Sequence, residues 1–331
     1  MKKTVFIPLF FILIITGCNP QGEWKDDQIN KKVKSTIHQL NDLVIESLAN
    51  NKPDQILLLS STRFMEKYSY EFDESVKQAS EEFSNNKFVI LHEYYNKSSE
   101  DNSLINTSFS ISGDDDFLIG FKALTKESYV IIGYLDNKIK QTMMAIVYGK
   151  YDSQWRINTM QFGIYKIMGK NAYEWYMKAK DDVDKKYYIN AASDMSFSLK
   201  SLKPANTLWK YIKEEEIYNY GLQLDSIIKS AVKIPFTINE IKTHPEIFKI
   251  SSFGLKEGYY PMIEYVTPIN LSDTLKLSNE VDQIHSVIKE VFSGISQEYD
   301  MVIYNAYNNK PTAISHYNSH IFSRRFEIKK D

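Results

Sequence analysis

The sequence contains a single cysteine, Cys18, among its 331 residues. A disulfide needs two thiols, so the chain has no disulfide of its own and depends on ordinary hydrophobic cores for its stability. The composition can supply such cores, because 43% of the residues are hydrophobic and 14% are aromatic. The chain also lacks a charge excess, since 40 basic and 42 acidic residues give a net charge of −2. Nucleic-acid binding requires strongly basic faces, so we expect no nucleic-acid partner.

A long apolar run is missing as well. The stretch from Val5 to Ile15 is apolar, but Pro8 interrupts it. It is also shorter than the roughly 20 residues that cross a bilayer as a helix. We see no transmembrane segment after it, so attachment to a membrane would need another device.

Motifs for catalysis or metal binding are also missing. The sequence has no serine nucleophile elbow, phosphate loop, CxxC or HExxH motif. His316 and His320 would share one face of a helix or of a strand, but a zinc site needs a third ligand that this spacing does not supply. We therefore expect no metal and no cofactor.

The N-terminal segment does carry a specific signal. Lys2 and Lys3 precede the apolar stretch, which ends in the small residues Thr16 and Gly17, as in a secretory signal peptide. The residues Ile15-Thr16-Gly17-Cys18 resemble the lipobox of bacterial lipoproteins. The resemblance implies that residues 1–17 are removed and that the thiol of Cys18 carries a diacylglycerol. Each buried methylene contributes about 0.8 kcal/mol, so several acyl chains hold a protein firmly on a membrane.

This resemblance places the protein in the bacterial cell envelope, at the outer membrane in a Gram-negative cell. Residues 18–26 are polar and are expected to form a tether. Asn19 stands where some enteric lipoproteins carry an inner-membrane retention aspartate, so that retention signal is absent. Lys25, Asp26 and Asp27 resemble the export signal of some surface lipoproteins. The periplasmic and the surface face therefore both stay open.

Hydrophobic periodicity predicts an α+β protein. In residues 27–166, apolar residues recur at helical spacing over 27–49, 54–68 and 71–84. Six stretches rich in β-branched and aromatic residues follow, at 88–95, 103–111, 116–124, 129–135, 142–148 and 154–165. We expect these helices to be followed by a curved, cone-like antiparallel sheet. This element order resembles the nuclear transport factor two-like fold, in which the open end of the cone often holds a ligand.

Two further units are expected after the cone. Residues 167–232 should form a helical spacer, because 172–204 resembles a single tetratricopeptide hairpin and one more helix is expected at 206–229. Residues 233–331 should form a small α+β domain of the order β-β-α-β-β. Its hairpin is expected at 246–253 and 259–267, and its later strands at 301–307 and 321–328. Ser278 is the expected cap of its helix, which Gly294 ends.

Three residues of the expected cone are candidates for a ligand site. Tyr134 and Asp136 alternate onto one strand face, and Tyr148 could join them from the next strand. The preferred interpretation is a lipid-anchored envelope protein with a non-catalytic binding role toward a small molecule, a glycan or an envelope protein. The alternative is a lipid-anchored hydrolase or isomerase that uses an Asp/Tyr pair in the cone, for which Asp136 would have to be desolvated.

Overall fold

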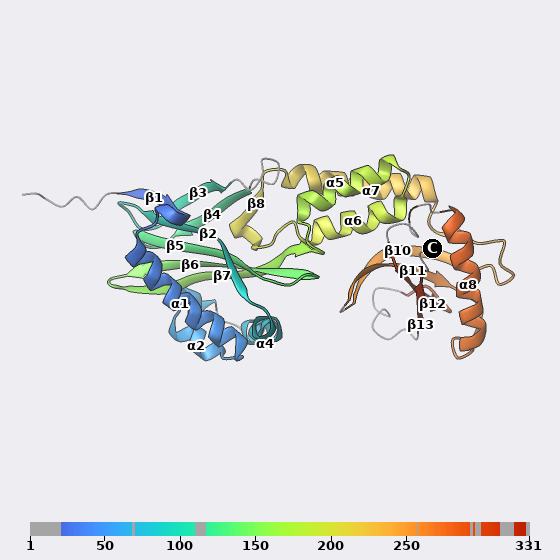
Figure 1. Ribbon diagram of the computed structural model, residues 1–331, viewed down its shortest axis with the longest axis horizontal. Coiled ribbons are helices and arrows are strands. Elements are labelled where there is room, and N and C mark those ends of the chain that lie inside the picture. Colours follow the sequence, from blue (N-terminus) through green and yellow to red (C-terminus); the bar gives the residue numbers. More distant parts are fainter. Residues whose placement is uncertain are drawn as a thin grey trace, which may run out of the picture.

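The computed structural model describes residues 21–67, 70–109, 117–255, 257–291, 294, 299–311 and 321–328. Over these residues the protein is α+β, as the periodicity predicts. The molecule is elongated, with a sheet at either end of its long axis and a group of helices between them (Figure 1). The predicted residues Cys18, His316 and His320 lie outside the described residues.

The helices and strands follow the chain in this order. The helices are α1 (Lys31–Ala49), α2 (Pro53–Leu58), α3 (Thr62–Glu66), α4 (Tyr70–Asn85), α5 (Ala172–Asp184), α6 (Tyr188–Lys200), α7 (Glu214–Val232) and α8 (Thr274–Val291), with 3-10 turns η1 (Asp26–Gln28) and η2 (Asn206–Leu208). The strands are β1 (Gly22–Lys25), β2 (Phe88–Lys97), β3 (Ser103–Phe109), β4 (Phe117–Ala123), β5 (Glu127–Leu135), β6 (Lys140–Tyr151), β7 (Gln154–Ile167), β8 (Trp209–Tyr211), β9 (Phe236–Thr237), β10 (Glu246–Leu255), β11 (Gly258–Val266), β12 (Met301–Tyr307) and β13 (Phe322–Glu327). None of the helices in the described ranges is long and apolar enough to cross a membrane.

The strands form three sheets. The first sheet has the order β1-β2-β5-β6-β7, the covering sheet β3-β4-β8 and the C-terminal sheet β13-β12-β11-β10-β9. The pairs are antiparallel except β11 with β12. The expectation that one sheet contains all six strands of residues 88–165 is therefore wrong. The β3–β4 hairpin leaves the first sheet and pairs with β8 from the helical region.

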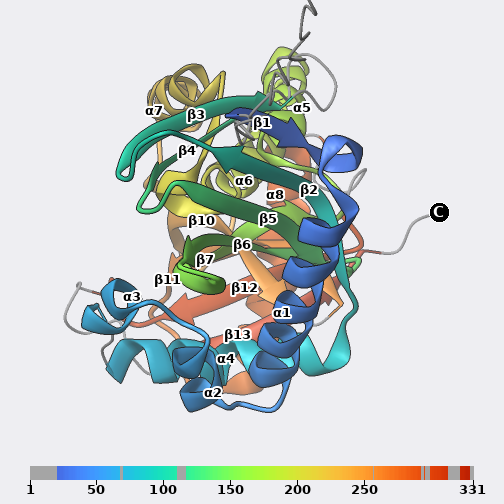
Figure 2. The same cartoon turned by 90° about the vertical axis from the view of Figure 1, so that its left-hand side faces the viewer.

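The first sheet is covered on both faces. Helices α1, α2 and α4 lie on one face, where Ile37, Val44 and Val76 pack against β5 and β6 (Figure 2). The covering sheet and the helical region lie on the other face, where Ile119 and Trp209 join the same core as Ile132. A strand buried on both faces has a nearly continuous apolar sequence instead of an alternating one. The sequences of β5 and β6 follow that rule, since residues 128–133 and 143–149 are buried without interruption.

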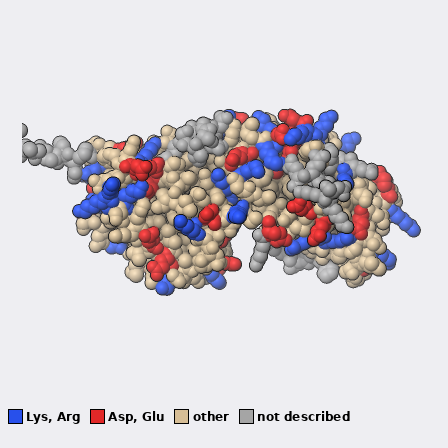
Figure 3. All heavy atoms as spheres, viewed as in Figure 1, with Lys and Arg blue, Asp and Glu red and all other residues tan. Residues whose placement is uncertain are grey.

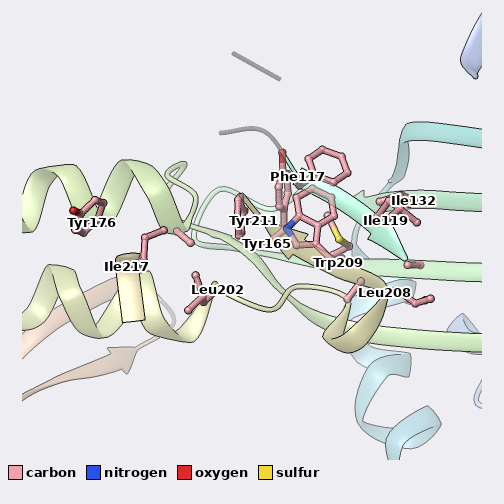
Figure 4. Packing of buried hydrophobic residues seen from close by; sticks show 14 of the residues in the cluster. Phe117, Ile119, Ile132, Tyr165, Tyr176, Leu202, Leu208, Trp209, Tyr211 and Ile217 are labelled. Carbon is pink, nitrogen blue, oxygen red and sulfur yellow. The ribbon is translucent and has the colours of Figure 1, made fainter. Parts of the chain in front are cut away.

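This second core crosses the boundary that was expected at Lys166. One cluster of buried side chains runs from the two sheets to the helices, as Figure 4 shows for Ile119, Trp209 and Tyr176. Within it the rings of Phe117 and Trp209 stack with centroids 3.5 Å apart and an interplanar angle of 10°. Residues 27–166 therefore share their core with the helical region.

The N-terminal segment differs from the expected tether and helix. Residues 22–25 form β1, an edge strand paired with β2, so only the residues before Gly22 remain for a tether. Helix α1 begins at Lys31, because the side chain of Asn30 caps it by accepting a hydrogen bond from the Lys32 amide. The helix expected at 54–68 is divided in two, because Ser60 leaves the helical path and bridges to Ile157 of β7.

The later elements follow the prediction with shifted ends. Helix α5 starts at a capping box made by Asn171 and Glu174. The helix expected at 206–229 begins at Glu214, because the chain first forms β8. Ser278 does not cap α8, which starts at Thr274, and the carboxylate of Asp273 accepts a hydrogen bond from the Lys276 amide there. The β-β-α-β-β order of the C-terminal domain is confirmed, with the short β9 added.

Helix α6 joins the two ends of the molecule. Its residue Ile189 lies in the C-terminal core, while Ala191 and Met195 lie in the core of the first sheet and helical region. Four of its polar residues are buried too, Asn190, Ser193, Asp194 and Ser198. Asp194 shares the ammonium of Lys178 with Asp182 of α5, at 2.6 and 3.1 Å respectively. Burial and the neighbouring carboxylate of Asp182 raise the pKa of Asp194 to about 8, although Lys178 opposes this shift.

We predict that this group makes stability fall as pH rises. Between the ordinary carboxyl pKa near 4 and the native value, the folded chain binds a proton that the unfolded chain does not, so the free energy of unfolding declines with rising pH. Asp194→Asn cannot titrate, so its stability relative to the parent protein should improve steadily between about pH 4 and pH 8. Urea unfolding at a series of pH values measures this, with Asp181→Asn on the exposed face of α5 as the control. Parallel pH profiles for the parent and Asp194→Asn would contradict the prediction.

Candidate functional site

The structure places the three predicted ligand-site residues apart. Tyr134 is half-buried on the face of the first sheet that meets the covering sheet and the helical region, with its ring 5.6 Å from that of Tyr165. Asp136 lies just beyond the end of β5 and is exposed. Tyr148 is fully buried on the opposite face, where its hydroxyl lies 3.4 Å from Oδ1 of Asn41 in α1. Burial raises the pKa of Tyr148 well above its ordinary value.

Strand register explains why these residues do not converge. Tyr134 pairs with Met143 and Tyr148 pairs with Tyr129, so the two tyrosines lie toward opposite ends of the β5–β6 pair. The face that carries Tyr134 is packed with side chains such as Phe117 and Trp209, and the face that carries Tyr148 is packed against α1. The three side chains therefore do not form one site, because Asp136 is exposed and the two tyrosines lie on opposite faces of the sheet.

Another set of ionisable groups does converge, around the buried carboxylate of Glu93 in β2. Its Oε1 accepts hydrogen bonds from Nε2 of His38 and from the hydroxyl of Tyr129, both at 2.6 Å. Its Oε2 lies 2.6 Å from the ammonium of Lys34. The Glu93 amide in turn donates to Oδ1 of Asp26 at 2.8 Å. Burial and the hydrogen bond to Glu93 raise the pKa of Tyr129 well above its ordinary value.

This Glu93 cluster links α1 to the first sheet through hydrogen bonds and an ion pair. Both oxygens of Glu93 already have partners, and the residue is only 3% exposed, so neither oxygen is open to a substrate. Lys34 and His38 are four residues apart on α1 and therefore share one face of the helix. Sequence reasoning missed the cluster, because this helical spacing is its only local signal and nothing local shows that Glu93 faces the helix.

We predict that Glu93→Gln lowers the free energy of unfolding by about 1–3 kcal/mol, because it removes the charged acceptor shared by the half-buried Lys34 and His38 and the buried Tyr129. Urea unfolding at neutral pH measures the loss. Glu46→Gln, on the exposed side of α1, removes the same charge from the surface and should change the free energy by less than about 0.5 kcal/mol. If the two substitutions lowered the free energy of unfolding equally, Glu93 would not be the residue that links α1 to the first sheet.

An open groove lies between α6, α7 and β10, which we call the central groove. It consists of two hollows of about 180 and 460 Å³ that share the lining residues Ala192, Asp225, Ile228 and Ile250. The helices approach closely at Gly221, where an added Cβ would lie 3.2 Å from Cδ1 of Leu199. The walls are mainly aliphatic, so the groove offers apolar surface to a ligand.

A cation stands at one end of the central groove. The ammonium of Lys200 lies over the ring of Phe197 at 5.9 Å and over the ring of Tyr259 at 5.7 Å. Burial lowers the pKa of Lys200, and among the described residues it forms no ion pair. A cation that is partly desolvated and lacks an anionic partner favours a ligand with an acidic group at this end.

The apolar surface continues beyond the groove onto its rim. Leu199 is 40% exposed, Leu222 58% and Tyr218 54%, and the last two lie one turn apart on the outer side of α7. Elsewhere acidic and basic side chains are interspersed over the face that Figure 3 shows. Contiguous exposed apolar residues beside a groove are typical of a surface that a partner covers.

No group of three or more side chains suited to hold a metal ion occurs in the part of the chain that the structure describes. Comparisons of the chain with protein-family models, with curated proteins and with solved structures give no match. The indications of function are therefore the lipobox-like residues at the N-terminus and the geometry of the surface.

Proposed function

We propose that the protein is a lipid-anchored lipoprotein of the bacterial cell envelope that binds another envelope protein through the central groove. The anchoring half of this proposal rests on the lipobox-like residues 15–18 behind a basic and apolar N-terminal segment. The binding half is carried by one observation: an apolar groove with an exposed apolar rim and an unpaired lysine among the described residues.

The anchor brings the folded part of the protein close to the membrane. Cys18 is separated from the first strand residue, Gly22, by only three residues. An extended chain spans at most about 3.6 Å per residue, so β1 lies within roughly 15 Å of the lipidated cysteine. The first sheet therefore sits next to the bilayer. The lipid is expected at the outer membrane in a Gram-negative cell.

The chemistry of the central groove indicates the kind of partner. The aliphatic walls suit an apolar segment, and Lys200 suits a carboxylate on that segment. The rim residues Tyr218 and Leu222 extend the apolar surface outside the groove, as a protein partner would require and an enclosed small molecule or a glycan would not. The partner is therefore expected to present apolar side chains next to an acidic residue.

The anchor is tested by Cys18→Ser. Without the thiol no thioether to diacylglycerol can form, so the variant should lose all labelling by a palmitate analogue. It should also leave the membrane fraction or keep its signal segment. Gel fluorescence after click labelling, with fractionation of the same cells, measures both. Undiminished labelling of Cys18→Ser would contradict the anchor.

The central groove is tested by in vivo photocrosslinking from a photoreactive amino acid at Tyr218. We predict one crosslinked species that Leu222→Asp reduces by at least about tenfold, because a charge in a covered apolar contact costs more than about 1.4 kcal/mol. Lys200→Glu should reduce it and Lys200→Arg should retain it. Leu275→Asp, on α8 and 73% exposed, is the matched control and should leave the yield unchanged.

Two results of the crosslinking experiment would contradict the binding role. One is a yield that does not respond to Leu222→Asp or to Lys200→Glu in a protein with a normal thermal unfolding midpoint. The other is a crosslinked peptide, identified by mass spectrometry, that contains no apolar residues next to an acidic one. Either result would place the partner surface elsewhere.

A further inference from the structure

A second concave surface lies in the N-terminal part of the molecule, where α2 and α3 meet the start of β7. It is a hollow of about 880 Å³, which we call the α3 hollow. The hollow forms where the chain leaves α2 at Ser60 and pairs with Ile157 of β7. The Ile157 amide donates a hydrogen bond to the Leu59 carbonyl at 2.9 Å. Figure 2 shows α3 beside the turn that joins β6 and β7. The α3 hollow shares no lining residue with the central groove, so a ligand bound in it is independent of the proposed function.

The charged side chains of the α3 hollow are mainly cationic. Arg63, Lys67 and Arg156 line it together with one acid, Glu66. None of the three cations forms an ion pair with a residue that the structure describes. Elsewhere in the protein lysines commonly pair with carboxylates, as Lys140 does with Glu82. An excess of unpaired cations in one concavity favours an anionic ligand.

Arg156 is oriented for such a ligand. Its Nη1 donates to the Leu58 carbonyl and its Nη2 donates to Oε1 of Gln154 at 2.6 Å, so its guanidinium is held in place by two neutral acceptors. The remaining N–H groups of the guanidinium stay available to an oxyanion. A planar guanidinium that is already oriented binds phosphate or carboxylate oxygens at a low cost in side-chain entropy.

The α3 hollow also has apolar lining that is open to solvent. Leu58 is 74% exposed and Met65 is 43% exposed, and both lie within the same concavity as the cations. Leu57 and Leu124 add further aliphatic lining. A ligand that covers these side chains must have an apolar part beside its anionic group.

We propose that the α3 hollow binds an anionic amphiphile, with its phosphate or carboxylate on Arg63, Lys67 and Arg156 and its acyl part on Leu58 and Met65. Such a ligand has an anionic phosphate or carboxylate group and an acyl chain in one molecule. A membrane phospholipid and a free acyl phosphate or fatty acid both have this chemistry. The hollow belongs to the domain that carries β1, so either source can reach it when the protein is anchored.

Calorimetric titration of the chain from residue 21 onward tests the proposal, since every described helix and strand lies within it. The probe is lauryl phosphate below its micelle concentration. It should bind at least about tenfold more tightly than inorganic phosphate, which lacks the apolar part, and than dodecylphosphocholine, which carries no net charge. Equal affinity for inorganic phosphate, or for dodecylphosphocholine, would overturn the proposal.

Paired variants assign the binding to the α3 hollow. The double substitution Arg63→Glu and Lys67→Glu changes two exposed residues and should weaken lauryl phosphate at least about tenfold. Lys31→Glu with Lys32→Glu makes the same charge change on exposed residues of α1 and should weaken it less than about twofold. Met65→Ser should weaken lauryl phosphate and leave inorganic phosphate unchanged. Equal loss in both double variants would overturn the assignment.

The source of the ligand is separated by vesicle flotation of the same unlipidated chain. Cofloating with phosphatidylglycerol vesicles but not with phosphatidylcholine vesicles, lost in the Arg63→Glu and Lys67→Glu variant, identifies a membrane lipid. Tight binding of lauryl phosphate without flotation identifies a free amphiphile. Both outcomes support the α3 hollow as the site, while flotation that the double variant does not change would overturn it.

Discussion

The whole arrangement depends on helix α6, which is packed between two cores. Ile189 at its start belongs to the C-terminal core, and Met195 further along the helix belongs to the core beneath the first sheet. A helix in this position has little surface open to water, so its sequence needs small and internally bonded polar residues as well as apolar ones. Ser198, for example, is buried and donates to the Ala172 carbonyl of α5.

Packing between the units also decides where binding surfaces lie. Tyr259 of β11 packs edge-on against Phe197 of α6. The central groove lies at this junction between α6, α7 and β10, and ligand sites are frequent where domains meet. In the N-terminal half, Trp209 from the helical region stacks on Phe117, and both rings belong to the core that covers the face of the first sheet opposite α1. Binding surfaces are therefore available at the edges of the layers, where the α3 hollow and the central groove are found.

The sequence by itself determined the α+β class, the order of the elements and most of their positions, because hydrophobic period and turn residues are local signals. The hairpin of β10 and β11 and the strand β12 were predicted within a few residues for that reason. The ends of the elements were less predictable, because some of them depend on partners that are distant in sequence. Ser60 pairs with Ile157, and residues 209–211 pair with β4. The proposed lipid anchor rests on the sequence alone, since residues 15–18 lie outside the described residues.

Only the tertiary structure decided which side chains meet. Tyr134 and Tyr148 are equally plausible site residues in the sequence. In the structure they lie toward opposite ends of the β5–β6 pair and in cores on opposite faces of the sheet. The Glu93 cluster joins Lys34 and His38 to a carboxylate that lies 55 residues beyond His38 in the sequence. The α3 hollow likewise joins Arg63 and Lys67 to the distant Arg156, and no local pattern predicts either meeting. Long-range packing, which depends on every layer at once, brings these groups together.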